Sequence, residues 1–161
     1  MAERKRVAAV CYRKVGAQVE VLLVRTTLGE RWTFPKGGID LSDTSPAEAA
    51  RREALEEAGV TGLIENEALC SYRHLAAIGG GFFKEQEVVA YLLKVTGTGG
   101  AGEPGRHPKW WPLSQAYAAL AENHPVAVSV EDLHRVLDAA SARLERAGVE
   151  APAAWIYDGG R

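Results

Sequence analysis

The chain has 161 residues, of which 47% are hydrophobic and 25% are charged, and its 19 basic and 21 acidic residues give a formal net charge of −2. This composition is typical of one soluble globular domain. The near-neutral charge excludes a protein that attracts nucleic acid or a membrane through an overall positive charge. Two cysteines are too few for a disulfide framework or a four-cysteine metal site, so we expect a cytoplasmic protein.

The first predicted elements are a β-hairpin and a helix. Runs rich in β-branched residues at 7–12 and 19–26 flank Gly16, which suits a turn. The first run is too short to be a signal-peptide core or a membrane span. A capping box begins at Ser45, with proline at the next position, and Gly59 is a typical stop signal. We therefore predict a helix from Pro46 to Ala58.

Strands and then helices are predicted in the rest of the chain. Residues 66–77 and 82–95 predict two strands around three consecutive glycines, and a short strand follows at 109–111. Two helices are predicted after it, with these inward positions: Leu113, Ala116, Tyr117, Leu120, Leu133, Val136, Leu137, Ala140 and Leu144. The order lacks a sustained alternation of strand and helix. We therefore expect an α/β protein of the α+β type, with a mixed sheet sandwiched between helices.

A single domain is predicted at 1–148, followed by a C-terminal tail at 149–161. The tail contains Trp155, Ile156 and Tyr157. Three large apolar side chains are expected to pack on the domain or on a second copy of the chain, so a homodimer is a possible assembly.

The helix at 46–58 carries three carboxylates on one side. A helix turns by about 100° per residue, so Glu53, Glu56 and Glu57 lie within about 100° of one another. Like charges at this spacing repel, which opposes helix formation. The side predicted to pack carries Ala47, Ala54, Leu55 and Ala58. A solvated acidic face is the simpler interpretation, whereas clustered carboxylates also suit Mg²⁺ or Mn²⁺.

The segment GGIDLSDTSPAEAARREALEEAGV resembles the Nudix box, whose pattern is G-x₅-E-x₇-R-E-U-x-E-E-x-G-U with U aliphatic. The second half matches closely. Counting back from Arg52 puts the first acidic position of the box on Thr44 and its glycine on Gly38. Aligning on Gly37 instead makes Asp43 the acid and requires one inserted residue. The contribution of this loop is therefore open.

The resemblance implies a Nudix-like fold and a hydrolase that cleaves a diphosphate linkage with the help of Mg²⁺ or Mn²⁺. It implies that Glu53, Glu56 and Glu57 hold the metal and that one of them accepts a proton from the attacking water. Gly37 or Gly38 would add a carbonyl oxygen. Arg52 would orient the glutamates.

The resemblance extends beyond the box: segments across residues 4–137 resemble diphosphoinositol polyphosphate and diadenosine polyphosphate phosphohydrolases. They include RWTFPKGG, EEAGVTG, GRHPKWW and ENHPV. The resemblance implies a small-molecule polyphosphate substrate, with no nucleic acid and no membrane partner. It implies that basic residues outside the box bind this substrate, and the candidates are Arg6, Lys36, Lys84 and Arg106.

Two departures weaken the inositol alternative. The segment KEQE at 84–87 contains two acids where those relatives have a basic run, and Lys109 stands where many have glutamate. Two other functions stay open: a housekeeping nucleoside triphosphate pyrophosphohydrolase, and a non-catalytic Nudix domain that binds a nucleotide and regulates a partner. Core packing is expected for Trp32, Trp110 and Trp111, a structural role for His74 and His124, and exposure for Glu85 and Glu87.

Overall fold

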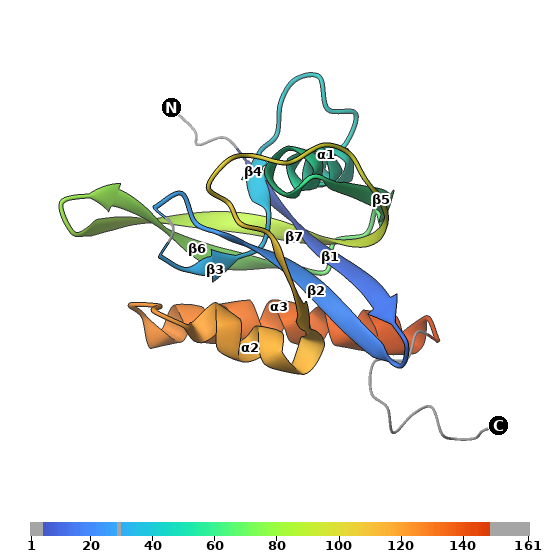
Figure 1. The fold of residues 1–161 in the computed structure, drawn as a ribbon. Coiled ribbons are helices and arrows are strands. Elements are labelled where there is room, and N and C mark those ends of the chain that lie inside the picture. The colour runs from blue at the N-terminus through green and yellow to red at the C-terminus, as the bar shows by residue number, and fades with distance from the viewer. Residues whose placement is uncertain (1–4, 29, 149–161) are drawn as a thin grey trace.

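The computed structural model describes residues 5–28 and 30–148, and it has three layers (Figure 1). A mixed eight-stranded sheet carries helix α1 on one face and helices α2 and α3 on the other. The strands are β1 (Arg6–Val15), β2 (Gln18–Arg25), β3 (Trp32–Thr33), β4 (Lys36–Gly38), β5 (Val60–Ile64), β6 (Cys70–Gly79), β7 (Phe82–Thr98) and β8 (Lys109–Pro112). The helices are α1 (Pro46–Ala58), α2 (Leu113–Ala121) and α3 (Ala127–Arg146). The predicted sandwich is confirmed.

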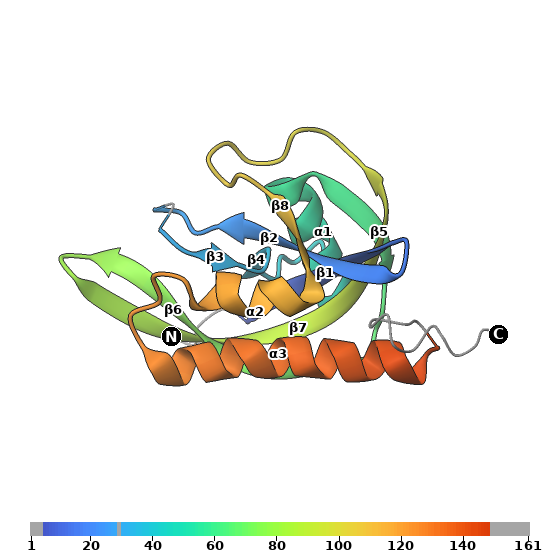
Figure 2. The ribbon, with the colours of Figure 1, turned by 60° about the horizontal axis from the view of Figure 1, so that its bottom comes forward.

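Strand β1 is the centre of the sheet. It pairs with β7 in parallel and with β2 and β4 in antiparallel orientation. The short strand β4 lies beside the start of β1, where Lys36, Gly37 and Gly38 pair with Ala8, Val7 and Arg6. The long strand β7 also pairs with β5 and β6, and the β6–β7 hairpin extends beyond the rest of the sheet (Figures 1 and 2).

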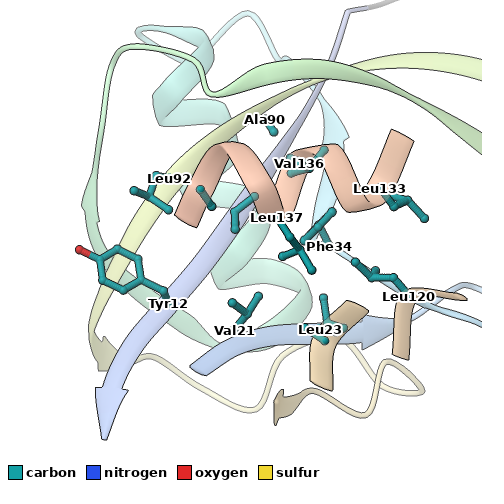
Figure 3. Packing of buried hydrophobic residues seen from close by; sticks show 14 of the residues in the cluster. Tyr12, Val21, Leu23, Phe34, Ala90, Leu92, Leu120, Leu133, Val136 and Leu137 are labelled. Carbon is teal, nitrogen blue, oxygen red and sulfur yellow. The ribbon is translucent and has the colours of Figure 1, made fainter. Parts of the chain in front are cut away.

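Alternate residues of the strands build a core on each face of the sheet, because side chains in a strand point to opposite faces in turn. Ala8, Val10 and Tyr12 of β1 face α2 and α3, where they join Phe34, Leu133, Val136 and Leu137 in one buried cluster (Figure 3). Val7, Ala9 and Cys11 face α1 and join its alanines. The predicted inward face of α3 is confirmed, since all five of its positions are buried.

Helix α1 begins and ends at the predicted residues. The Ser45 side chain accepts a hydrogen bond from the Glu48 backbone N–H at 3.1 Å, and Pro46 occupies the first helical position. Gly59 adopts a left-handed conformation with φ of 70°, and its N–H donates to the Leu55 carbonyl. A cap of the Ser45 kind stabilises a helix by about 1 kcal/mol. Both ends are therefore fixed by local interactions.

Strand β5 was not predicted, and the strand expected from residue 66 begins at Cys70. Gly62 interrupts β5 at a bulge, where a side-chain Cβ would lie 1.8 Å from the Lys94 carbonyl oxygen. Glycine is required there for the approach of two backbones, although it weakens the strand signal in the sequence.

The predicted tail residues Trp155, Ile156 and Tyr157 lie outside the described residues. Cys11 and Cys70 are free thiols, as expected. None of the helices within residues 5–28 and 30–148 combines the length and the apolar character needed to cross a membrane.

Candidate active site

The carboxylates of α1 do not together form a solvated acidic face, which was the simpler interpretation of their spacing. Glu53 and Glu57 are buried, with exposed fractions of 9% and 6%, whereas the Glu56 side chain is 55% exposed. Leu55, which was predicted to pack, is only half-buried. The helix therefore turns two of its acids toward the sheet.

Gly37 makes room for one of these acids. A Cβ built at Gly37 would lie 2.2 Å from the Glu53 carboxyl group, closer than any non-bonded contact allows. The Glu53 carboxylate therefore rests directly on the backbone of β4. Burial raises its pKa above the ordinary value, and the nearby Arg52 opposes that shift.

Arg52 connects the helix, the preceding loop and β4. Its Nε and Nη2 donate to the two carboxylate oxygens of Asp43 at 2.9 and 2.8 Å, and Nη2 also donates to the Gly38 carbonyl at 3.0 Å. Its Nη1 donates to Glu53 Oε2 at 3.1 Å and to Glu56 Oε1 at 3.2 Å. This guanidinium therefore holds two of the three glutamates in position.

Asp43, and not Thr44, faces Arg52. The two-pronged hydrogen bond from Arg52 lowers the pKa of Asp43 to about 2, so this carboxylate is ionised at neutral pH. Thr44 is exposed. The geometry therefore favours the alignment on Gly37 with one inserted residue, in which Asp43 is the acid of the loop.

Glu57 is surrounded by cations. Its Oε1 accepts a hydrogen bond from the Lys36 backbone N–H at 3.2 Å, and its Oε2 lies 3.4 Å from Arg106 Nη2. Burial raises the pKa of Glu57, and the charges of Arg106 and Lys36 oppose this. Burial likewise lowers the pKa of Lys36, against the attraction of Glu57. Lys36 is therefore not the solvated loop lysine that its sequence position also allowed.

Arg106, a predicted substrate-binding residue, is paired within the protein. Besides Glu57, it contacts Glu103 at 3.4 Å and donates to the Arg25 carbonyl at 3.1 Å. The glycine-rich segment carries it to this position. Gly99 N–H donates to the Gly59 carbonyl at 2.8 Å, and Glu103 N–H donates to the Glu57 carbonyl at 3.3 Å, so the segment docks on the end of α1.

The predicted metal ligands are close together but are not assembled into one cluster. No group of three or more His, Cys, Asp or Glu residues arranged to hold a metal ion is found among residues 5–28 and 30–148. Glu56 points to Arg52, and Glu57 points to Arg106 and Lys36. The donor set nevertheless fits a hard divalent cation, because such ions prefer carboxylate oxygens, and Glu53 and Glu57 are two buried carboxylates on one side of α1.

A cavity of about 150 Å³ lies beside Lys36. Its lining includes Arg6, Leu28, Arg31, Lys36, His74, Phe83 and Gln86. Arg6, one of the predicted substrate-binding residues, lines this cavity. Lys84 is exposed and is not among the lining residues.

Leu28, Phe83 and Gln86 were not singled out from the sequence. The sequence contained one signal for this hairpin. Phe82 and Phe83 are adjacent large apolar side chains beside three glycines, and exposed apolar side chains that lie together often mark a binding surface.

Among the other aromatic and histidine residues, Trp32 is in the core as predicted, whereas Trp110 and Trp111 are only partly buried and His74 lines the cavity. Trp32 is buried and packs edge-on against Trp111, with ring centres 5.4 Å apart. Burial lowers the pKa of His74 to about 2, so its imidazole is neutral, and His124 Nδ1 accepts a hydrogen bond from the Val126 N–H. Glu85 and Glu87 are exposed, as predicted.

A family model described as NUDIX domain matches residues 3–133 of the chain. Diphosphoinositol polyphosphate phosphohydrolase 3-beta of Bos taurus is 32% identical over 132 residues, which covers 76% of this chain and 73% of that protein. Nudix hydrolase 17, mitochondrial, of Arabidopsis thaliana is 45% identical over 71 residues, and the match covers 40% of this chain and 38% of that protein. The chain thus spans less than half the length of this plant relative.

Solved structures have the same fold. A Caenorhabditis elegans Ap4A hydrolase superposes with a TM-score of 0.61 at 26% identity and covers 88% of this chain and 98% of that chain. The NUDIX domain of Shewanella oneidensis NrtR, solved with ADP ribose, superposes with a TM-score of 0.63 at 25% identity and covers 89% of this chain and 90% of that chain.

Proposed function

Since this chain belongs to the Nudix family, we propose that it is a metal-dependent hydrolase that cleaves a phosphoanhydride bond in a small polyphosphorylated substrate. One observation carries the proposal: Glu53 and Glu57 are buried against the backbone of β4, and Lys36 of the same strand lines a neighbouring cavity. Burying two carboxylates is costly for a merely structural helix. In a hydrolase that binds a cation there, the positive charge of the cation would compensate the two buried carboxylates.

Glu53, Glu56 and Glu57, with the Gly37 carbonyl, would hold Mg²⁺ or Mn²⁺. Gly37 is the better carbonyl candidate, since the Gly38 carbonyl already accepts from Arg52. When bound, the cation neutralises charge on the phosphate oxygens and lowers the pKa of bound water.

The protein's own groups would bind and orient the substrate. Arg52 orients Glu53 and Glu56 through its hydrogen bonds, and Asp43 fixes Arg52. Arg6 and Lys36 lie between the cavity and the glutamates, where they would bind phosphate oxygens. A carboxylate among Glu53, Glu56 and Glu57 would accept the proton of the attacking water.

Dinucleoside polyphosphates, such as diadenosine polyphosphates, are our preferred substrates over diphosphoinositol polyphosphates. Arg106 and Lys36 both interact with Glu57, so the basic rim has less uncompensated charge than the sequence suggested. A ligand with many phosphates around a small ring needs a wide basic surface, and the exposed Glu85 and Glu87 oppose one.

A non-catalytic, nucleotide-binding regulatory domain is the second candidate. It is favoured by the unassembled carboxylates and by the fold shared with the NrtR domain solved with ADP ribose. The intact set of three glutamates argues against it.

A substrate panel with Mg²⁺ or Mn²⁺ and product identification tests the proposal. The panel contains diadenosine polyphosphates, diphosphoinositol polyphosphates, ADP-ribose and nucleoside triphosphates. We expect the fastest turnover with a polyphosphate and none in excess EDTA. Pyrophosphate and a nucleoside monophosphate as the best products would identify a housekeeping triphosphate hydrolase instead. Absence of turnover with every compound would favour the regulatory candidate.

A further inference from the structure

We propose that Arg106 is an internal counter-ion of Glu57, and that a divalent cation has to displace it before the cation can bind this glutamate. The segment 99–106 between β7 and β8 would thereby control metal binding at α1. The inference deepens the proposed function and rests on it for the assignment of Glu57 as a metal ligand.

The two charged groups are paired in a buried environment. Arg106 Nη2 lies 3.4 Å from Glu57 Oε2, and the exposed fractions of the two side chains are 12% and 8%. A buried carboxylate that loses its compensating positive charge is strongly destabilising. The other oxygen of Glu57, Oε1, accepts a hydrogen bond from the Lys36 backbone N–H. Both oxygens of this carboxylate therefore already have partners from the protein.

The backbone fixes Arg106 at this position. The Arg106 carbonyl accepts from the Arg25 N–H at 2.6 Å, and the Glu103 N–H donates to the Glu57 carbonyl at 3.3 Å. A Cβ built at Gly102 would lie 2.9 Å from the Glu57 carbonyl oxygen, so glycine allows the segment to lie directly on the last turn of α1 (Figure 1). The pairing of Arg106 with Glu57 therefore follows from the path of the backbone.

A cation and the Arg106 guanidinium compete for Glu57 because both are positive. Hard cations such as Mg²⁺ and Mn²⁺ coordinate carboxylate oxygens directly. A cation at Glu57 Oε2 would place two positive charges beside one oxygen, and charges this close repel strongly where water is excluded. Binding of the cation therefore requires the guanidinium to move away from Glu57.

The displaced arginine has other partners close by. Its Nε lies 3.4 Å from Glu103 Oε1, and its Nη1 donates to the Arg25 carbonyl at 3.1 Å. Displacement thus breaks the contact with Glu57 and keeps the other two, which leaves Arg106 beside the cation with Nη2 free to donate to an anion. Binding of the cation first and of an anion second is compatible with the substrate-binding role that the sequence predicted for Arg106.

Metal affinity tests the counter-ion without turnover. Calorimetry compares Mn²⁺ binding to wild type, Arg106→Gln and Arg51→Gln. Because Arg106→Gln removes the competing charge, we expect it to bind Mn²⁺ about 10-fold more tightly than wild type. Arg51→Gln is the matched control, since Arg51 is a cation of α1 that pairs with Glu48. It should keep the wild-type affinity within about 2-fold, because charges that do not touch the site are screened.

Melting temperatures separate a counter-ion from a merely structural contact. In EDTA, Arg106→Gln leaves Glu57 without its charged partner, so the melting temperature should fall by about 5 °C. In saturating Mg²⁺ the cation replaces the guanidinium as the compensating charge, so less than about half of this deficit should remain. A structural contact would give the same deficit in both conditions.

A measurement on the wild-type chain keeps the test valid if Arg106→Gln does not fold. The Nε–H resonance of Arg106 should shift in NMR spectra when Mg²⁺ is added, whereas that of Arg51 should stay in place. Arg106→Lys, which keeps the positive charge, identifies the Arg106 resonance by its loss.

Equal Mn²⁺ affinity of wild type and Arg106→Gln would overturn the counter-ion, as would a stability deficit that Mg²⁺ does not reduce or an Arg106 resonance that Mg²⁺ does not shift. These results would leave the hydrolase standing. Mn²⁺ binding to Arg106→Gln but not to wild type, in a chain that hydrolyses nothing, would support the counter-ion and refute the hydrolase. Absence of Mn²⁺ binding to both chains would refute the metal site and the counter-ion together.

Discussion

The contact between Gly37 and Glu53 predicts that a single methyl group will disable the site while the fold survives. In Gly37→Ala, the new Cβ would lie 2.2 Å from the Glu53 carboxyl carbon and Oε2. Non-bonded carbon atoms approach to about 3.5 Å, so the carboxylate must move by at least about 1.3 Å. Gly37 is not among the residues with positive φ, so alanine adds no backbone strain.

The size of the two effects follows from this displacement. A misplacement of about 1 Å in a catalytic group costs roughly 100-fold in rate, so kcat/KM should fall by about that factor. Stability should fall by only about 1–3 kcal/mol, because the obstacle is the end of a flexible side chain. For a domain of this size the melting temperature would drop by roughly 2–12 °C.

Steady-state kinetics and thermal denaturation measure the two effects on the same preparation. Gly97→Ala is the matched control, because a Cβ at Gly97 meets no atom within 4 Å and its φ is not positive. Activity of Gly37→Ala within a few-fold of Gly97→Ala would refute the role given to the Glu53 position.

Three further predictions concern charged groups. Glu57→Gln keeps the volume of the side chain and removes its charge, so turnover should fall by at least about 100-fold while circular dichroism stays native; near-normal activity would contradict a metal ligand there. Asp43→Asn should impair activity clearly more than Thr44→Val, because only Asp43 holds Arg52; equal effects would contradict this. Hydrogen bonds from two arginines outweigh burial and lower the pKa of Asp132, so its stabilising contribution is present above the unfolded-state pKa of about 4 and is lost as pH falls below it. Urea denaturation should therefore show Asp132→Asn to be less stable than wild type at a pH of about 7, where aspartate is ionised. The difference in stability should shrink in acid. Glu131→Gln, a control at an exposed site, should match the stability of wild type at every pH.

Local signals in the sequence were sufficient for the elements that local interactions stabilise. Helix α1 starts and stops where Ser45, Pro46 and Gly59 predict, because caps act within one turn. The apolar spacing of α3 predicted its buried face, because side chains three and four residues apart lie on the same side of a helix. The box around Arg52 identified the family, since it lies within one continuous segment.

Contacts between distant segments decided the rest. Helical spacing put Glu53 and Glu57 on one face but did not show what covers it; they are buried because Gly37 and Lys36 of β4 lie against them. Strand β5 was not predicted because Gly62, which is needed at a bulge between β5 and β7, weakens the strand signal in the sequence. The cavity joins Leu28 and Phe83, which no sequence pattern connects. Periodicity in a sequence reports which residues share a face, whereas what covers that face depends on backbone approach and charge pairing in the folded chain.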